Sequence, residues 1–241
     1  LAPKLYPLIM DNVFPTFMMP QGVLSHMMRA IAAHRPGIIS QVGMKTFVDP
    51  RIDGGKINDA AKASEEEIVQ LLNLNGEEYL FYPAFPLDVA IIKGSKADTK
   101  GNISVEKEAL HIEQFEMAAA AKNSGGIVMV QVDEIVEHGQ LHPQMVTVPS
   151  ALVDYVILGD PENSGQHFIG NRKPVPSWCG DEKIPFDNIE SLPFDIHKVI
   201  CRRGILELHA GDFINLGIGI PMGISEVLNE EGLIEQISSS I

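Results

Sequence analysis

The sequence has few cysteines, few basic residues and no long apolar run, and each shortage excludes a class of protein. Two cysteines among 241 residues, Cys179 and Cys201, are too few for a disulfide framework or a zinc pattern. Lysine and arginine total 18 against 32 aspartates and glutamates, and the resulting net charge of −14 repels nucleic-acid phosphates. A membrane-spanning helix needs about 18 consecutive apolar residues, and no run is that long. We therefore expect neither a nucleic-acid partner nor a membrane partner.

The ends of the sequence lack the features of a secreted chain and of a complete one. The start shows no basic segment followed by an apolar one, and together with the few cysteines this predicts a cytoplasmic location. The first residue is Leu1 rather than methionine, and residues 237–241 have a strand-like pattern with no polar tail. We expect that the sequence is part of a longer polypeptide.

Apolar spacing predicts an α/β fold in the first two thirds of the chain. The spacing is helical over 22–34 and 106–122, and strand-like over 37–42, 88–92 and 127–136. Asn75-Gly76 separates strand-like runs at 68–74 and 78–82, which is typical of a hairpin whose turn needs positive φ. The order strand, helix, strand after residue 88 predicts a right-handed crossover, with the first strand buried on both faces of the sheet.

The pattern changes between residues 159 and 193, where prolines recur and no period is clear. We interpret this stretch as an irregular connection between domains. Periodicity then returns and predicts a helix over 196–208, a strand over 212–216, a helix over 221–229 and a strand over 233–241. We therefore expect a first domain over 1–190 and the beginning of a second domain over 195–241.

A glycine-containing segment joins the predicted strand at 212–216 to the next predicted helix. Gly217 and Gly219 there would let a ligand approach the backbone, and the helix N-terminus offers free amides to an anion. A tight strand-to-helix turn explains the same residues equally well. The dinucleotide-binding fingerprint needs a third glycine at position 222, which is Met222, so the match to oxidoreductases is off by one.

Other candidate site residues are a glutamine and two histidines. Gln21 stands just before a predicted helix, where its amide can donate outward and stabilise a developing oxyanion; an ordinary loop position is the alternative. His138 and His142 have the spacing of a helical metal pair, but Gly139 and Pro143 place them in a loop. We therefore expect no metal site.

Five segments, in the same order and spacing, resemble the family I coenzyme A transferases. They are 19–23, 46–51 with 54–56, 88–92, 97–102 and 215–221. The resemblance extends over almost the whole chain, and it is strongest to the bacterial acetate or propionate coenzyme A transferases of short-chain acid metabolism. The fold that it implies is a pair of related open-sheet α/β domains, the first lacking its start and the second only begun. Family members are usually homo-oligomers, so we expect one here.

The resemblance implies a transfer of coenzyme A between a short-chain acyl-CoA and a carboxylic acid. A glutamate attacks the thioester, and the reaction proceeds through an acyl-glutamyl anhydride and a glutamyl-CoA thioester. Coenzyme A is a substrate, and no metal or redox cofactor is required. Spacing in the family places the glutamate directly after Ile241, outside this sequence, so the chain alone is expected to be inactive.

The resemblance also assigns site residues. Gln21 matches the glutamine that faces the reacting carbonyl, and Gly22, Thr46, Gly217 and Gly219 match positions that contact the substrate or coenzyme A. Relatives usually carry glycine where this sequence has Lys45, a difference that bears on the acyl pocket and on substrate choice.

Two other classes share this general architecture. A sugar-phosphate isomerase or an effector-binding regulatory domain would have an α/β fold of the same kind. We expect neither, because the sequence shows no catalytic acid of an isomerase and no DNA-binding extension. A dinucleotide-dependent oxidoreductase is indicated only by Gly217 and Gly219.

Overall fold

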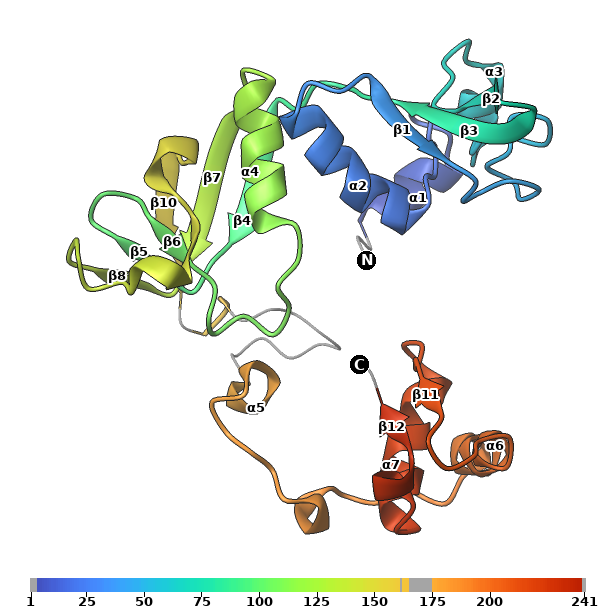
Figure 1. Ribbon diagram of the computed structural model, residues 1–241, viewed down its shortest axis with the longest axis vertical. Coiled ribbons are helices and arrows are strands. Elements are labelled where there is room, and N and C mark those ends of the chain that lie inside the picture. The colour runs from blue at the N-terminus through green and yellow to red at the C-terminus, as the bar shows by residue number, and fades with distance from the viewer. Residues whose placement is uncertain (1–3, 161, 165–174, 240–241) are drawn as a thin grey trace. The chain divides into compact units, whose positions relative to one another are not determined.

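The computed structural model describes residues 4–160, 162–164 and 175–239, and it confirms a mixed α/β fold (Figure 1). The chain forms two compact units, Leu1–Cys179 and Gly180–Ile241, which are described separately. The division falls inside the connection predicted at 159–193, part of which, at 161 and 165–174, lies outside the described residues. No helix within these described ranges is long and apolar enough to cross a membrane.

A parallel three-stranded sheet forms the core of the first unit. Its strands are β4 (Val89–Lys93), β7 (Ile127–Val132) and β10 (Tyr155–Leu158), in the order β10-β7-β4. Helix α4 (Gln114–Asn123) lies between β4 and β7 in sequence and packs on one face of the sheet through Ala118 and Ala121. The parallel pairing of β4 with β7 confirms the predicted strand, helix, strand unit.

The opposite face of this sheet is exposed, contrary to the prediction for 88–92. Every second residue of β4 is buried, but Val89 and Ile91 are 48% and 74% exposed. Ile127, Tyr155 and Ile157 are also exposed, and the strand register places them on the same side as Val89 and Ile91. The described residues therefore cover only one face of β4.

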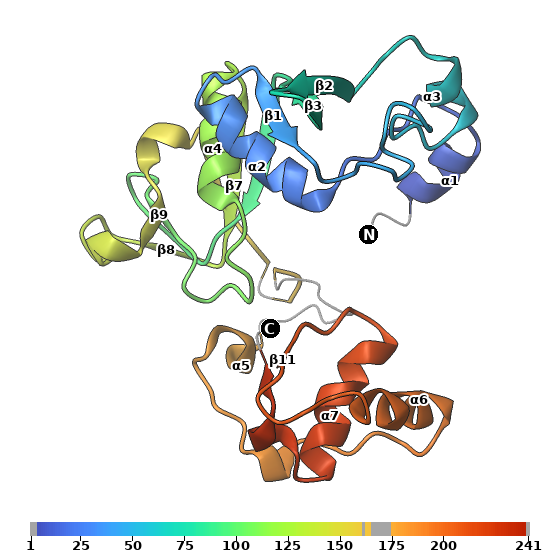
Figure 2. The same cartoon turned by 45° about the vertical axis from the view of Figure 1, so that its right-hand side comes forward.

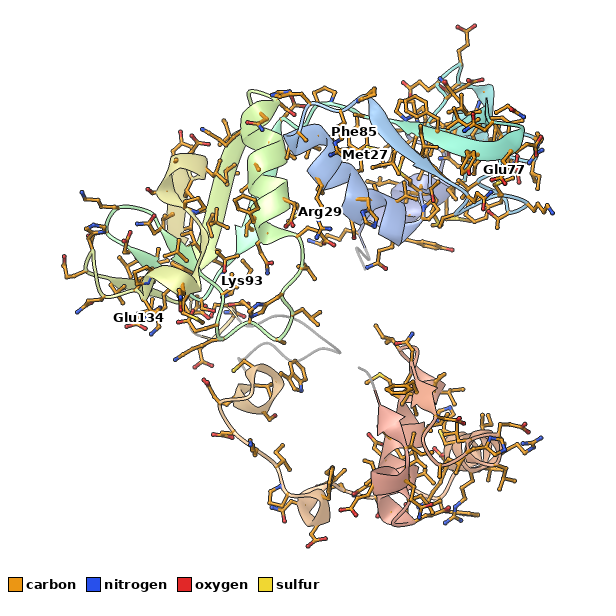
Figure 3. All side chains as sticks on the ribbon, viewed as in Figure 1. Met27, Arg29, Glu77, Phe85, Lys93 and Glu134 are labelled. Atoms are coloured by element: carbon orange, nitrogen blue, oxygen red, sulfur yellow. The ribbon has the colours of Figure 1, made fainter. Side chains whose placement is uncertain are left out.

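A second sheet lies beyond the end of β4 and has the order β8-β5-β6-β9. Its strands are β5 (Lys96–Asp98), β6 (Ile103–Ser104), β8 (Glu134–Val136) and β9 (Val146–Val148). The single strand predicted over 127–136 is thus divided at Asp133, where the chain passes from one sheet to the other. The Asp133 carboxylate lies 2.9 Å from the Nζ of Lys93, which Figure 3 labels. This ion pair joins the end of β4 to the end of β7.

The helix predicted over 106–122 begins eight residues late, at Gln114, because a tertiary contact holds the segment before it. Glu108 is 4% exposed, and its carboxylate lies 2.9 Å from Lys93 Nζ and 3.3 Å from Ser95 Oγ. Burying that carboxylate against a lysine of the sheet fixes the chain in an irregular path. Helical spacing at Leu110 and Ile112 was misleading, since both side chains are exposed.

The N-terminal part of this unit has its own antiparallel sheet, β1-β3-β2. It contains β1 (Gly37–Ser40), β2 (Gln70–Leu74) and β3 (Glu77–Pro83), with helices α1 (Leu5–Met10), α2 (Gln21–Ala32) and α3 (Asp59–Ala63). Asn75 and Gly76 have φ of 54° and 89°, which confirms the predicted hairpin turn. Helix α2 packs on this sheet and on α4, as Figures 1 and 2 both show.

The second unit is a small cluster around Cys201, Ile205, Val227 and Leu228. A short helix α5 (Pro176–Cys179) ends the first unit. The second unit contains α6 (Ile196–Ile205), β11 (Phe213–Ile214), α7 (Gly223–Glu230) and β12 (Ser238–Ser239). β11 and β12 pair in parallel. The prediction of a strand over 233–241 is wrong for its first half. Ile234–Gln236 forms a 3-10 turn there, and the Ile234 side chain packs on the cluster.

The turn after β5 is built around one buried carboxylate. Asp98, 4% exposed, accepts hydrogen bonds from the backbone amides of Lys100 and Asn102, from Asn102 Nδ2 at 2.8 Å and from His138 Nδ1 at 2.8 Å. Burial raises the pKa of Asp98, but these bonds from Asn102, His138 and the amides outweigh it and hold the pKa well below its usual range. The turn over 98–102 therefore depends on an ionised carboxylate.

We expect Asp98→Asn to lower the free energy of unfolding by about 2 kcal/mol near pH 7, because a charged acceptor with four donors is lost. The pKa of Asp98 is lower in the folded state than in the unfolded state. Its stabilisation is therefore complete above about pH 5 and is lost as the pH falls below that value. Urea unfolding should show a difference between wild type and variant that shrinks towards about pH 3. Asp11→Asn, at an exposed position, is the control, and a pH-independent difference for Asp98→Asn would contradict the prediction.

Candidate functional site

The N-terminus of α2 is an uncapped helix end. Gln21 is its first residue, Pro20 precedes it, and no side chain caps it. Leu24 N donates to Pro20 O at 3.1 Å, so the amides of Gln21, Gly22 and Val23 have no partner inside the helix. The helix dipole adds partial positive charge at the same point. This end can therefore bind an anion or an oxyanion.

Gln21 lies at this helix end as the sequence predicts, and its side chain is exposed. Within the part of the chain that the structure describes, its amide makes no hydrogen bond, so Nε2 is free to donate to a bound ligand. Arg29, two turns further along α2 and labelled in Figure 3, pairs with Glu116 of α4 at 3.2 Å.

The loop over 41–56 lies against the segment that leads into α2. Phe17 and Lys56 form a β-bridge, and Met18 N donates to Gly55 O at 2.8 Å. Gly55 has φ of 74°, and a Cβ there would lie 2.6 Å from Met18 O, so the approach requires glycine. The structure thus brings the loop that contains Thr46 against Phe17 and Met18, in the segment that leads to Gln21.

A buried carboxylate organises this loop. Asp49 is 1% exposed and accepts from Lys45 N and from Arg51 N, Nε and Nη2 at 2.8–3.1 Å. The side-chain bond from Arg51 holds the pKa of Asp49 well below its usual range. Arg51 also reaches Glu78 on β3 at 2.7 Å, which ties the loop to the sheet. From the sequence, Asp49 was named only within the segment 46–51 that resembles the family. An aspartate two residues before an arginine in a proline- and glycine-rich turn was the signal for its role.

Thr46 and Lys45 have different roles in this loop. Thr46 Oγ1 donates to Gly43 O at 2.7 Å and accepts from Val48 N at 3.3 Å, so its hydroxyl already supports the turn. A contact between Thr46 and substrate stays a prediction. Lys45 has φ of 60°, a conformation that favours glycine, and its side chain is exposed.

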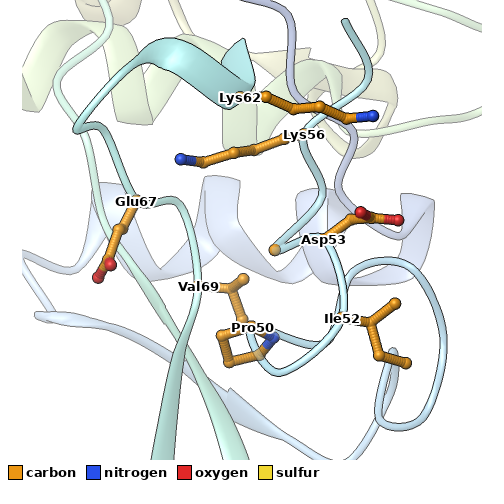
Figure 4. A pocket seen from close by; sticks show the side chains of 8 residues that line it. Pro50, Ile52, Asp53, Lys56, Lys62, Glu67 and Val69 are labelled. Atoms are coloured by element: carbon orange, nitrogen blue, oxygen red, sulfur yellow. The ribbon is translucent and has the colours of Figure 1, made fainter. Parts of the chain in front are cut away.

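A pocket of about 270 Å³ opens beside this loop (Figure 4). Its lining residues come from the loop, from helix α3 and from the segment between α3 and β2, and they are Pro50, Ile52, Asp53, Gly54, Lys56, Lys62, Glu67 and Val69. None of them was predicted as a site residue from the sequence. No sequence period links them, because the Phe17–Lys56 bridge and the turns of the loop bring them together.

In the second unit, Gly217 and Gly219 lie between β11 and a 3-10 turn at Ile220–Met222, which leads into α7. The predicted strand-glycine-helix order is therefore present. Gly219 has φ of 113°, so its backbone conformation requires glycine. A Cβ on Gly223 would lie 2.7 Å from Leu192 Cδ1 and 2.9 Å from Cys201 Sγ, so this glycine serves the packing of α7.

Gly22 and Gly217 differ from the other described glycines. At both positions a Cβ would meet no atom within 4 Å, and neither φ lies in the left-handed region. Each of the other described glycines has a close neighbour at the Cβ position, a positive φ or both. The fold of the described residues therefore does not require glycine at 22 or 217, and the backbone at both positions is open to an approaching group.

The histidines and cysteines have structural partners. His138 pairs with Asp98, and His142 Nδ1 accepts from Gln144 N at 3.2 Å. Burial raises the pKa of the Cys201 thiol, which makes it a poor nucleophile. No three His, Cys, Asp or Glu residues in the described ranges are grouped so that they could hold a metal ion.

Comparison with known proteins agrees with these features. Residues 9–159 match the family model described as coenzyme A transferase. The chain is 46% identical over 220 residues to the caffeate CoA-transferase of Acetobacterium woodii, covering 91% of this chain and 41% of that protein. It is 39% identical over 232 residues to the acetate CoA-transferase YdiF of Escherichia coli K12, covering 96% and 42%.

The fold comparison gives the same family. The crystal structure of the acyl-CoA transferase YdiF from E. coli O157:H7, in a thioester complex with CoA, superposes with a TM-score of 0.87 and 35% identity. The match covers 99% of this chain and 46% of that one. The chain spans about two fifths of the length of the curated relatives named above. From its sequence and its fold, the chain belongs to the coenzyme A transferase family.

Proposed function

We propose that the polypeptide carrying this chain transfers coenzyme A between a short-chain acyl-CoA and a carboxylic acid. One observation carries the proposal beyond family membership: the two glycines that the fold does not require, Gly22 and Gly217, are both in segments that resemble the family's substrate-binding segments. The names of the relatives, caffeate and acetate CoA-transferase, support a carboxylic acid as the acceptor.

The proposed chemistry is covalent catalysis by a glutamate that follows Ile241 in the complete polypeptide. Its carboxylate oxygen attacks the thioester carbonyl, and the coenzyme A thiolate leaves to give an acyl-glutamyl anhydride. The thiolate then attacks the glutamyl carbonyl, which releases the acid and forms glutamyl-CoA. A second acid takes over coenzyme A by the reverse steps. Each step is a nucleophilic acyl transfer with no change of oxidation state, so the proposed mechanism uses no redox cofactor, and it assigns no step to a metal. Coenzyme A is the transferred substrate.

The residues of this chain would stabilise the charge that develops in each step. Every attack passes through a tetrahedral oxyanion, which needs hydrogen-bond donors already in place. Gln21 Nε2 and the unpaired amides at the start of α2 are such donors, and Gly22 leaves room for the ligand beside them. We further propose that the protein is a cytoplasmic homo-oligomer, as family members usually are.

The proposal is tested by trapping the covalent intermediate. The full polypeptide is incubated with acetyl-CoA or propionyl-CoA without acceptor, and its intact mass is measured. We expect a coenzyme A adduct on a glutamate that follows Ile241, and the adduct should disappear on addition of acetate. A well-folded protein that forms no adduct with any short acyl-CoA would sink the transferase mechanism.

Gln21→Ala should lower kcat about 100-fold, the loss typical of removing one oxyanion donor. The melting temperature should change little, because Gln21 is exposed and makes no side-chain hydrogen bond with any described residue. Steady-state kinetics and thermal unfolding of the full polypeptide give the two values. Gln144→Ala, at another exposed glutamine, is the control and should match wild type in both. Unchanged kcat for Gln21→Ala would remove this residue from the mechanism.

Gly22→Ala and Gly217→Ala should each lower kcat/KM for acyl-CoA about tenfold or more by displacing the ligand. Stability should stay level or rise slightly, because alanine fits both backbones without a clash and has the higher helix propensity at Gly22. Gly125→Ala makes the contrast, since its φ of 81° predicts a loss of stability with normal kinetics. Wild-type kinetics in both site variants would show that no ligand approaches these glycines.

A further inference from the structure

The backbone on either side of Gln21 sets the position of this residue. The side chain is exposed, and its amide makes no hydrogen bond with any described residue. After Gln21, helix α2 packs into the core through Val23 and Met27, which are 3% and 0% exposed. Before it lie the segment 16–18 and two further residues. The position of the first turn of α2 therefore depends on what holds this segment as well as on the packing of the helix.

Residues 55–57 hold the segment by antiparallel pairing. Met18 N donates to Gly55 O at 2.8 Å. Ile57 N donates to Thr16 O at 2.9 Å, and the bridge between residues 17 and 56 lies between these two bonds. The end of this pairing at Met18 is only three residues before Gln21 in the sequence.

The link from Met18 to Gln21 is short and stiff. Met19 packs on the buried cluster that contains Val23. Pro20 has φ of −57° and ψ of 134°, and its ring fixes φ near this value. A displacement of Met18 is therefore passed on to the first turn of α2, which carries the Gln21 amide and the free backbone amides.

The buried carboxylate of Asp49 fixes the loop that contacts Met18. Gly55 N donates to Phe47 O at 2.9 Å, and Gly54 N donates to Asp49 O at 3.1 Å, so the loop closes on itself at this point. Inside the loop the Asp49 carboxylate, 1% exposed, accepts from backbone and side-chain donors of residues 45 and 51. Another path of the loop would leave this buried charge without its donors, which is costly.

We infer that Asp49 is a positioning residue for Gln21 and acts through Gly55 and Met18. The inference rests on the proposed function of Gln21 as a donor to the oxyanion. Such a donor works only in the correct place, and a displacement of about 1 Å can cost about 100-fold in rate. Loosening the loop should therefore lower kcat and leave KM nearly unchanged, because Gln21 acts on the transition state.

Gly55→Ala and Gly54→Ala form a matched pair in the full polypeptide. Both glycines have positive φ, 74° and 60°, so both alanines strain the backbone and should lower stability to a similar degree. A Cβ at Gly55 would lie 2.6 Å from Met18 O, whereas at Gly54 the nearest atom is Pro50 Cα at 3.8 Å. We expect Gly55→Ala to lower kcat about tenfold or more with KM within about threefold, and Gly54→Ala to keep kcat within about twofold of wild type.

A double-mutant cycle with Gln21→Ala tests Asp49 itself. In Asp49→Asn, either orientation of the amide faces two donors with an NH2 group, so the loop loses its fixed path. The substitution should lower kcat about tenfold in the wild-type background but less than about threefold in Gln21→Ala. Arg51→Met, which removes only the side-chain donors, is the second variant for use if Asp49→Asn does not fold. Arg203→Met, from an exposed ion pair of the second unit, is the control and should match wild type.

Hydrogen exchange of the full polypeptide without substrate tests the contact independently of activity. In Arg51→Met, a peptide covering residues 14–21 should exchange about tenfold faster than in wild type, while a peptide covering β7 should be unchanged. Equal losses of kcat in both backgrounds, or wild-type exchange at 14–21 in the folded variant, would overturn the inference. Absence of a coenzyme A adduct on wild type counts instead against the transfer reaction, so the two failures are distinguished.

Discussion

The buried carboxylate of Asp49 is the contact on which the geometry of the first unit's site depends. Four donors from Lys45 and Arg51 keep it ionised in a place where an unpaired charge would be costly. With the loop fixed in this way and tied to β3 through Glu78, Gly55 can hold the segment at Met18 that leads into α2. The segment that leads into α2 contacts this loop, and residues of the loop line the pocket, so a change at Asp49 would disturb both.

The glycines separate what the fold needs from what a ligand needs. Gly43 has φ of 96° and a Cβ position 2.5 Å from Tyr82 Oη, and Gly55 is similarly constrained, so both are explained by the backbone itself. Gly22 and Gly217 have neither constraint. They belong to different units, yet each stands beside the start of a helix or of a 3-10 turn, where free amides gather. This shared property is the observation behind the proposed role of both glycines in binding acyl-CoA.

Local patterns predicted much of the fold. The Asn75-Gly76 hairpin, α2 and the parallel pair β4 and β7 follow from turn chemistry and from apolar periods that involve near neighbours only. The errors occur where contacts distant in sequence decide the path. Glu108 is held by Lys93, so the helix begins late, and the strand after Ile127 is interrupted at Asp133, which pairs with the same lysine.

The sequence by itself determined the α/β class, the resemblance to coenzyme A transferases and the positions of Gln21, Gly22, Gly217 and Gly219 at element ends, because these depend on residue type and short spacing. It could not show that the described residues cover only one face of β4. An apolar run indicates that a strand prefers to be buried, but it does not indicate which other segments pack against it. Only the tertiary structure revealed the role of Asp49 and the close approach of Gly55 to Met18. Both depend on which donors and acceptors are brought within about 3 Å of each other by the turns of a loop, and no local pattern encodes that distance.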